Sequence, residues 1–268
     1  CWLTVARWLI REVAARHGAS VTFVPKLDQG MAGSGMHFHL ALQRDGQPVM
    51  RDGSGELSDE ALSLIGGLAS RAAPLAAFGN TVTSSYLRLV PGQEAPTEIT
   101  WGRCDRTTLF RVPLDFGGGS VQSHGLNPGE ADIESDSLVC TTVEYRGPDG
   151  SAFQHLLLAA VTVCVEEGLR DPQSRDLARS LEVPSGADRK EGGSFERLPP
   201  SAMAAARSLR ESRAFFEDRG FSDALVDYVI ERLEAERDED LSARLRALPE
   251  GERLAESRRL MHKDLHKH

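Results

Sequence analysis

An apolar run, Leu156–Val165, places the strongest constraint on the fold, and it is followed by Glu166 and Glu167. A helix needs about 20 apolar residues to cross a bilayer, and this run has roughly half that length. It is apolar on nearly all sides. The sequence therefore predicts a buried core helix over Ala152–Glu167 and no membrane-spanning element.

Composition and charge narrow the possible partners. With 268 residues, 40% hydrophobic and 26% charged, the chain is long enough for one large domain or two small ones, and it is not disordered. Its net charge of −9 argues against broad binding to nucleic acid or to anionic membranes. The 4 Cys form no CxxC pair, so we expect no structural zinc site and a reducing, cytoplasmic location.

Hydrophobic periodicity predicts a mixture of helices and short strands. Ser58 is a candidate N-cap, and Asp45-Gly46 is a hairpin turn signal. A glycine-rich stretch precedes an alternating segment that is typical of a strand with two different faces. We expect helices over 2–17, 58–71 and 152–167, a further helix that starts at 74, and a helical segment over 201–268 with a break at 221–222. We expect strands over 21–24, 36–42 and 138–146, and a strand-loop-strand over 84–113. We also expect an exposed insertion over 114–136 and polar, irregular chain over 171–200.

Two strands carry paired polar side chains. His37 and His39 occupy alternate positions, so both imidazoles point to one face, where they could bind a metal or a polyanion. Glu144 and Arg146 repeat this geometry and offer a carboxylate for a divalent cation and a guanidinium for an anion. The spacing alone also fits half-buried histidines bonded to backbone, and an exposed ion pair.

Arginines gather in a segment rich in Gly and Pro. Such a concentration in an acidic protein indicates an anionic substrate, although solvated surface charge would give the same composition. These arginines surround Glu94 and are Arg88, Arg103, Arg106 and Arg111.

Several blocks together resemble the glutamine synthetase family (glutamate–ammonia ligases and γ-glutamyl-amine ligases). Gly33–His39 is similar to the family signature Gly-Ser-Gly-Met-His-x-His, and Lys26 stands where the family has Lys-Pro. Ser85–Pro96 resembles its Arg-bearing strand and flap loop. Trp101–Pro113 and Val143–Asp149 resemble its next and last blocks, in the family's order.

The resemblance implies a fold and an activity. The fold is α+β, with a curved, largely antiparallel sheet, flanking helices and a helical C-terminal segment over 201–268. The activity is ATP-dependent ligation of glutamate with ammonia or an amine through a γ-glutamyl phosphate, giving glutamine or a γ-glutamyl amide. It implies Mg²⁺ or Mn²⁺ as cofactor, and a homo-oligomeric ring with sites at subunit interfaces.

The resemblance also implies roles for individual residues. His37 and Glu144 would bind the metal, and His39, Arg106 and Arg111 would bind ATP. Glutamate would be held by Gly33, Arg88, Arg106 and Arg146. Glu94 would shield the acyl phosphate from water and accept a proton from ammonium. The residues implied as catalytic are Glu94, Arg88, Arg106 and Arg146.

Other features depart from the family pattern. Thr142 and Val139 stand where the family has a phosphate-binding Arg and a Lys. The family's remaining acidic metal ligands and its N-terminal β-grasp domain lie upstream of the helix that opens this chain. We therefore expect residues 1–268 to be the C-terminal part of a catalytic domain, inactive alone. The alternative is a non-catalytic glutamine synthetase-like subunit used for binding or assembly.

Overall fold

The computed structural model describes most of the chain. The expected insertion over 114–136 lies outside the described residues, and so does Glu94. The described residues are 2–28, 31–90, 95–113, 141–184 and 195–265.

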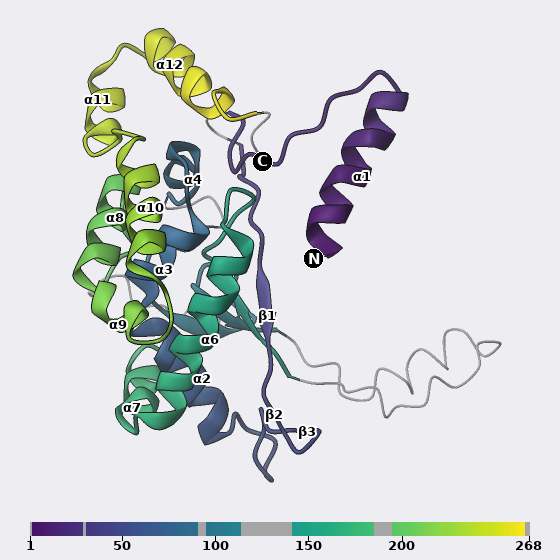
Figure 1. The fold of residues 1–268 in the computed structure, drawn as a ribbon, viewed down its shortest axis with the longest axis vertical. Helices are drawn as coiled ribbons and strands as arrows, with labels where there is room; N and C mark the ends of the chain where they lie inside the picture. Colours follow the sequence, from purple (N-terminus) through teal and green to yellow (C-terminus); the bar gives the residue numbers. More distant parts are fainter. Residues whose placement is uncertain (1, 29–30, 91–94, 114–140, 185–194, 266–268) are drawn as a thin grey trace, which may run out of the picture.

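Helices predominate, and the strands are short (Figure 1). The helices are α1 (Trp2–Arg16), α2 (Asp59–Ala69), α3 (Ala72–Gly79), α4 (Thr83–Arg88), α6 (Gln154–Arg170), α7 (Gln173–Ser180), α8 (Ala202–Glu211), α9 (Arg213–Glu217), α10 (Asp223–Glu234), α11 (Leu241–Ala247) and α12 (Glu250–His262). The strands are β1 (Phe38–Leu40), β2 (Gln43–Arg44), β3 (Gln47–Pro48), β4 (Trp101–Arg103), β5 (Phe110–Val112) and β6 (Val143–Tyr145).

One 4-stranded sheet organises the region of interest, in the order β1-β6-β5-β4. β6 lies antiparallel to both β1 and β5, whereas β5 and β4 are parallel. The sheet is therefore mixed. The expected antiparallel pairing is present among β1, β6 and β5, but not between β5 and β4. The hairpin predicted at Asp45-Gly46 is confirmed by the antiparallel pair β2 and β3.

The core lies where helices pack together behind this sheet. α2 contacts α6 and α7, and α3 contacts α6 and α8. Phe78 on α3 meets Phe216 and Phe221 with ring centroids 5.3 and 5.6 Å apart. These fully or largely buried rings join the C-terminal helices to the middle of the chain.

Side-chain caps fix where several helices begin. The Ser58 hydroxyl accepts a hydrogen bond from Ala61 N at 3.1 Å, which confirms the predicted N-cap of α2. Asp59 and Glu60 follow in its first turn, where the helix dipole favours anions. Ser222 caps α10 in the same way, as the predicted break at 221–222 requires.

Three secondary-structure predictions were wrong. Val21–Val24 forms no strand. Arg88 lies at the end of helix α4, not on a strand, and the Thr83 N–H and hydroxyl donate to Glu236 at 2.7 and 2.6 Å. A carboxylate at the first turn stabilises this short helix from a distant part of the chain. The polar segment 171–200 contains α7, whose Ser174 and Ala178 are buried.

Helix α6 is less buried than its apolar run predicts. Leu157 and Val161 are buried, but Leu158 on the other side is 42% exposed. No single described helix is long and apolar enough to cross a membrane; α2 and α3 reach that length only together, across a bend of 72°. Both helices are largely buried in the core.

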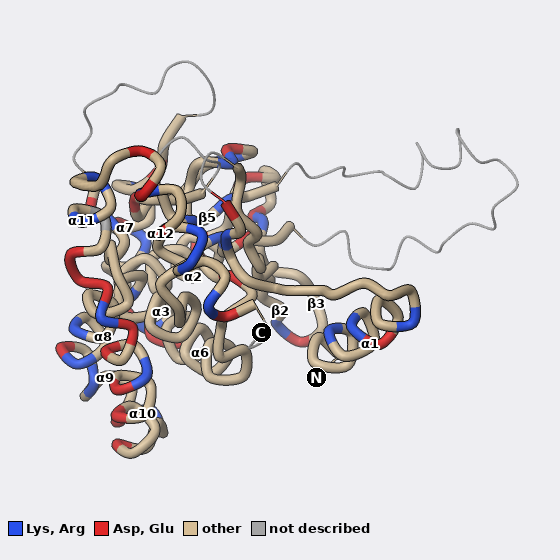
Figure 2. The backbone as a smooth tube through the Cα atoms, turned by 90° about the horizontal axis from the view of Figure 1, so that it is seen from above, with Lys and Arg blue, Asp and Glu red and all other residues tan. Residues whose placement is uncertain are grey.

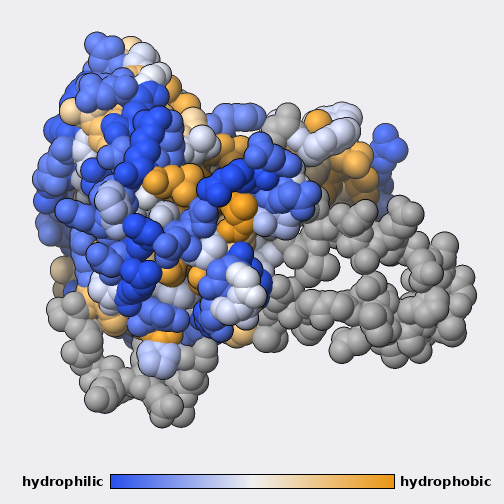
Figure 3. Space-filling view, turned by 90° about the horizontal axis from the view of Figure 1, so that it is seen from below, coloured by the Kyte–Doolittle hydropathy of each residue, from blue (hydrophilic) through white to orange (hydrophobic). Residues whose placement is uncertain are grey.

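The surface mixes both signs of charge and scattered apolar groups. Basic and acidic residues are interspersed along the described chain (Figure 2). Hydrophobic residues appear in separate patches on the face seen in Figure 3. The N-terminal helix α1 has no buried residue, and Trp2 and Trp8 are 88% and 59% exposed. Two of its arginines, Arg7 and Arg11, stack over Phe23 at 5.3 and 5.1 Å.

We predict that Gly168→Ala destabilises the fold. An added Cβ would lie 2.3 Å from Ser63 O and 2.7 Å from Gly67 Cα, at the crossing of α2 and α6. Overpacking of this kind costs about 1–3 kcal/mol. The matched control is Gly251→Ala on α12, where a Cβ would meet nothing within 4 Å. Urea unfolding of both variants checks the prediction, and equal midpoints would contradict it.

Candidate active site

One face of the sheet gathers the polar side chains that the sequence singled out. The register pairs His39 with Glu144, and Glu144 with Arg111. Directly paired residues point to the same face, as do residues at alternate positions of one strand. His37 and Arg146 therefore join this face, and the two polar pairs predicted from separate strands share one surface.

The opposite face of the same strands is apolar and buried. Phe110 and Tyr145 are a register pair whose rings stack with centroids 5.3 Å apart. Both are 1% exposed. This packing holds β5 against β6, so the polar face projects from a fixed support.

The Glu144 carboxylate is the centre of the polar face and is itself buried, at 2% exposure. Its Oε1 lies 2.6 Å from His37 Nδ1 and accepts a hydrogen bond from Arg146 at 3.2 Å. Arg111 Nε lies 2.5 Å from Oε2 as a charge contact, without the alignment of a hydrogen bond. Arg111 on β5, His37 just before β1 and Arg146 just after β6 thus compensate one buried charge.

His37 is held in the form that can bind a metal. Burial, followed by the nearby Arg146 guanidinium, lowers the pKa of His37, while Glu144 acts in the opposite direction. The imidazole is therefore mostly neutral at pH 7, and neutral imidazole is the ligating form.

Arg88 reaches the same region from α4. Its side chain is 4% exposed and donates to Gly147 O and, at 3.2 Å, to Pro148 O. A Cβ on Gly33 would lie 2.3 Å from Arg88 Cγ, so this position requires glycine. The glycine-rich stretch therefore lies directly against the arginine.

The other predicted residues lie at the edge of the cluster or outside the described chain. His39 is exposed, and its Nδ1 lies 3.1 Å from the Thr142 hydroxyl. Arg106 is exposed but close enough to Arg146 to lower its pKa, after the larger effect of burial. The structure describes neither Glu94 nor Val139.

The donor set suits part of a site for a hard divalent cation. Glu144 offers a carboxylate and His37 a neutral imidazole on adjoining strands. Mg²⁺ prefers about six ligands, largely oxygen. No group of three or more His, Cys, Asp or Glu side chains suited to a metal occurs in the described part of the chain. The two residues therefore fit a metal that takes its remaining ligands from elsewhere.

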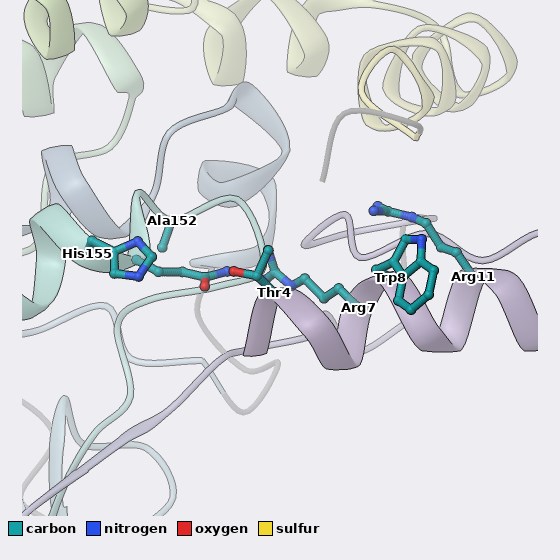
Figure 4. Close-up of a pocket in the computed structure, with 7 residues that line it drawn as sticks. Thr4, Arg7, Trp8, Arg11, Ala152 and His155 are labelled. Atoms are coloured by element: carbon teal, nitrogen blue, oxygen red, sulfur yellow. The ribbon is translucent and has the colours of Figure 1, made fainter. Parts of the chain in front are cut away.

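A separate pocket of about 380 Å³ lies between α1 and the start of α6 (Figure 4). None of the predicted site residues lines it. Its lining is Thr4, Arg7, Trp8, Arg11, Ala152, Gln154 and His155. This pocket is distinct from the polar face of the sheet.

Sequence reasoning missed two buried residues beside Arg88. Lys26 is 2% exposed, and Asp149 is completely buried. Asp149 was visible in the last matched block, but a carboxylate in a Gly/Pro turn is typical of an exposed loop. Its burial depends on partners that are distant in sequence.

Two substitutions next to His37 should shift its pKa in opposite directions. Glu144→Gln removes an anion that stabilises the imidazolium, so we predict a further decrease in the pKa of His37. Arg146→Met removes a cation and should raise it. NMR titration of the His37 ring measures both, with Arg44→Met as a control, since Arg44 pairs with the distant Glu60. Shifts in the same direction for the two site variants would contradict this account.

Comparisons with known proteins identify the family to which this chain is similar. The family model of the glutamine synthetase catalytic domain matches residues 2–245. Glutamine synthetase of Pyrococcus horikoshii is 38% identical over 164 residues, which are 61% of this chain and 32% of that protein. The Frankia alni enzyme is 36% identical over 224 residues, 81% of this chain and 43% of that protein.

Solved structures show the same fold. A structure of GmaS without ligand matches with a TM-score of 0.66 and 26% identity, over 93% of this chain and 51% of that one. The Plasmodium falciparum glutamine synthetase matches with a TM-score of 0.65 and 18% identity, over 94% of this chain and 52% of that one. The chain spans less than half the length of the two curated relatives above. It belongs to the glutamine synthetase family, within the catalytic domain.

Proposed function

We propose that this chain forms the C-terminal part of the catalytic domain of an ATP-dependent carboxylate–amine ligase. The proposed reaction joins glutamate to ammonia or an amine, with ATP converted to ADP and phosphate. The observation that supports it most strongly is the polar face of the sheet, where Glu144, His37, Arg111 and Arg146 are in contact. A buried carboxylate beside two guanidinium cations, with a neutral imidazole next to it, suits a reaction that brings several anions together.

The amino-acid substrate would lie between the glycine-rich stretch and the arginines. Arg88 is buried and fixed by backbone carbonyls, so its guanidinium can hold a carboxylate with little loss of entropy. Gly33 would present its backbone to glutamate because a side chain has no room there. Arg146 and Arg106 would hold the second carboxylate and the phosphoryl group that forms on it.

The nucleotide would lie over the outer part of the same face. His39 and Arg111 flank Glu144 in the register and would contact ATP, with Arg106 shared between nucleotide and substrate. Thr142 hydrogen-bonds with His39 at the position where the family resemblance implies an arginine, so this chain would neutralise the phosphates with fewer cations.

His37 and Glu144 would hold Mg²⁺ or Mn²⁺. When bound, the divalent ion would neutralise phosphate charge during phosphoryl transfer. The 2.6 Å contact between His37 and Glu144 would have to open for both to ligate the ion. Arg111 and Arg146 would keep the carboxylate oriented. Glu94 would act from the flap loop, where it would exclude water and accept a proton from ammonium.

A second candidate is a non-catalytic subunit of the same fold. It is favoured by the small metal donor set of the described residues and by Thr142. A cytoplasmic location, a homo-oligomeric ring with sites at subunit interfaces and the domain limits stay predictions.

We predict that the whole protein containing this chain releases phosphate from ATP only when glutamate and an amine are both supplied. Residues 1–268 alone should show no measurable turnover, because each missing charge-stabilising group costs about 10²–10³-fold in rate. Phosphate release and amide formation measure both activities. Absence of glutamate-dependent turnover in the whole protein would favour the non-catalytic subunit.

The metal assignment has its own test. We predict that His37→Ala and Glu144→Ala in the whole protein each weaken Mn²⁺ binding by at least about tenfold, since even indirect partners of metal ligands have effects of that size. Isothermal titration measures the affinity. The control is His155→Ala on the exposed start of α6. Unchanged affinity in both site variants would remove the assignment.

A further inference from the structure

A second buried carboxylate lies behind the proposed substrate site. Asp149 is completely buried, and its Oδ1 accepts hydrogen bonds from Ser151 N at 2.9 Å and Ser151 Oγ at 2.7 Å. Its Oδ2 accepts one from Asn80 Nδ2 at 2.8 Å and lies 3.8 Å from Arg88 Nε. The two oxygens therefore have different partners. Oδ1 accepts from Ser151 in the turn after β6, whereas Oδ2 accepts from Asn80 and faces Arg88 at the end of α4.

The backbone around Asp149 joins the elements that form this site. Gly35 and Asp149 form an isolated antiparallel bridge, and Met36 N donates to Pro148 O at 3.0 Å. Asp149 N donates to Gly79 O at 3.2 Å. The turn that bears Asp149 thus contacts both the glycine-rich stretch and the end of α3.

Charge compensation gives Asp149 a specific importance for Arg88. A guanidinium that is 4% exposed has lost most of its hydration. Burial lowers the pKa of Arg88, and Asp149 is the largest influence that raises it. The hydrogen bonds of Arg88 to Gly147 O and Pro148 O fix its position, but carbonyl groups carry no full charge.

We propose that Asp149 is a positioning residue: its carboxylate compensates the buried charge of the Arg88 guanidinium and orients it toward an anionic substrate at the glycine-rich stretch. The inference rests on the proposed function for the identity of that substrate, glutamate. It does not need the proposed function for the contact itself. Asp149 is completely buried behind the site and acts through Arg88.

The informative variant is Asp149→Asn. When its amide oxygen faces Ser151, this variant keeps the hydrogen-bond acceptor there. An uncharged NH₂ group then replaces the charged Oδ2 and faces two donors, Asn80 and Arg88. The matched control is Glu236→Gln. Glu236 is another largely buried carboxylate that holds α4, but at Thr83, and it pairs with Lys263. Both variants disturb the support of α4, and only the first removes charge next to Arg88.

The first readout needs no ligand. Phenylglyoxal modification of Arg88 in the whole protein, mapped by mass spectrometry, should become about tenfold faster in Asp149→Asn, because the ion pair at 3.8 Å is lost and an opposite charge at such a distance shifts a pKa by about one unit or more. Glu236→Gln should leave this rate near that of the wild type. Equal Arg88 reactivity in wild type and Asp149→Asn would overturn the inference, whatever the protein's function.

The second readout separates positioning from general loss of structure. Asp149→Asn should raise the dissociation constant for glutamate about tenfold with ATP affinity unchanged, since a charge-assisted contact is weakened at one ligand only. A parallel loss of both affinities would overturn the inference. A wild-type protein that binds no glutamate would refute the proposed function, while Arg88 reactivity still decides the role of Asp149.

A milder variant tests the same inference if Asp149→Asn does not fold. Ser151→Ala keeps the Asp149 charge and removes the hydroxyl that donates to Oδ1 at 2.7 Å. Arg88 modification should then increase by a smaller factor than tenfold but above that of Glu236→Gln. No increase over the control would overturn the inference.

Discussion

The burial of the Glu144 carboxylate is the interaction on which the rest of the site depends. A carboxylate at 2% exposure needs compensation, because an unpaired charge in the interior costs several kcal/mol. His37 just before β1, Arg111 on β5 and Arg146 just after β6 supply it. Because these partners come from segments at β1, β5 and β6, the pairing of these three strands is also what assembles the polar face.

A second buried carboxylate also lies beside an arginine. Asp149 lies next to Arg88, and the turn that bears it contacts the glycine-rich stretch. Glu144 is on the sheet, whereas Asp149 is in the turn after β6, so the two carboxylates come from one short stretch of chain. The last sequence block that resembles the family therefore supports both the metal-side and the substrate-side groups of the proposed site.

Sequence alone could predict the parts that depend on local pattern. Alternation placed His37 and His39 on one face, and Glu144 with Arg146 on another strand's face; the register then brought both pairs together. Capping chemistry predicted the start of α2 at Ser58, which its side-chain hydrogen bond confirms.

Predictions that depended on distant partners were less successful. Helix α4 was assigned as strand because its N-terminus is stabilised by Glu236, far along the sequence. Helix α7 was missed because its sequence is polar and its buried residues meet α2; a Cβ on Gly66 would lie 1.8 Å from Ser174 O. The roles of His37, Glu144 and Arg88 came from family resemblance, since spacing alone left other interpretations open.

Anomalous diffraction at the manganese edge, from crystals of the whole protein grown with Mn²⁺ and a non-hydrolysable ATP analogue, would locate the metal. We predict an ion in direct contact with both the Glu144 carboxylate and the His37 imidazole, with Arg111 and Arg146 still beside the carboxylate. A manganese peak that touches neither residue, with the His37–Glu144 contact intact, would contradict it.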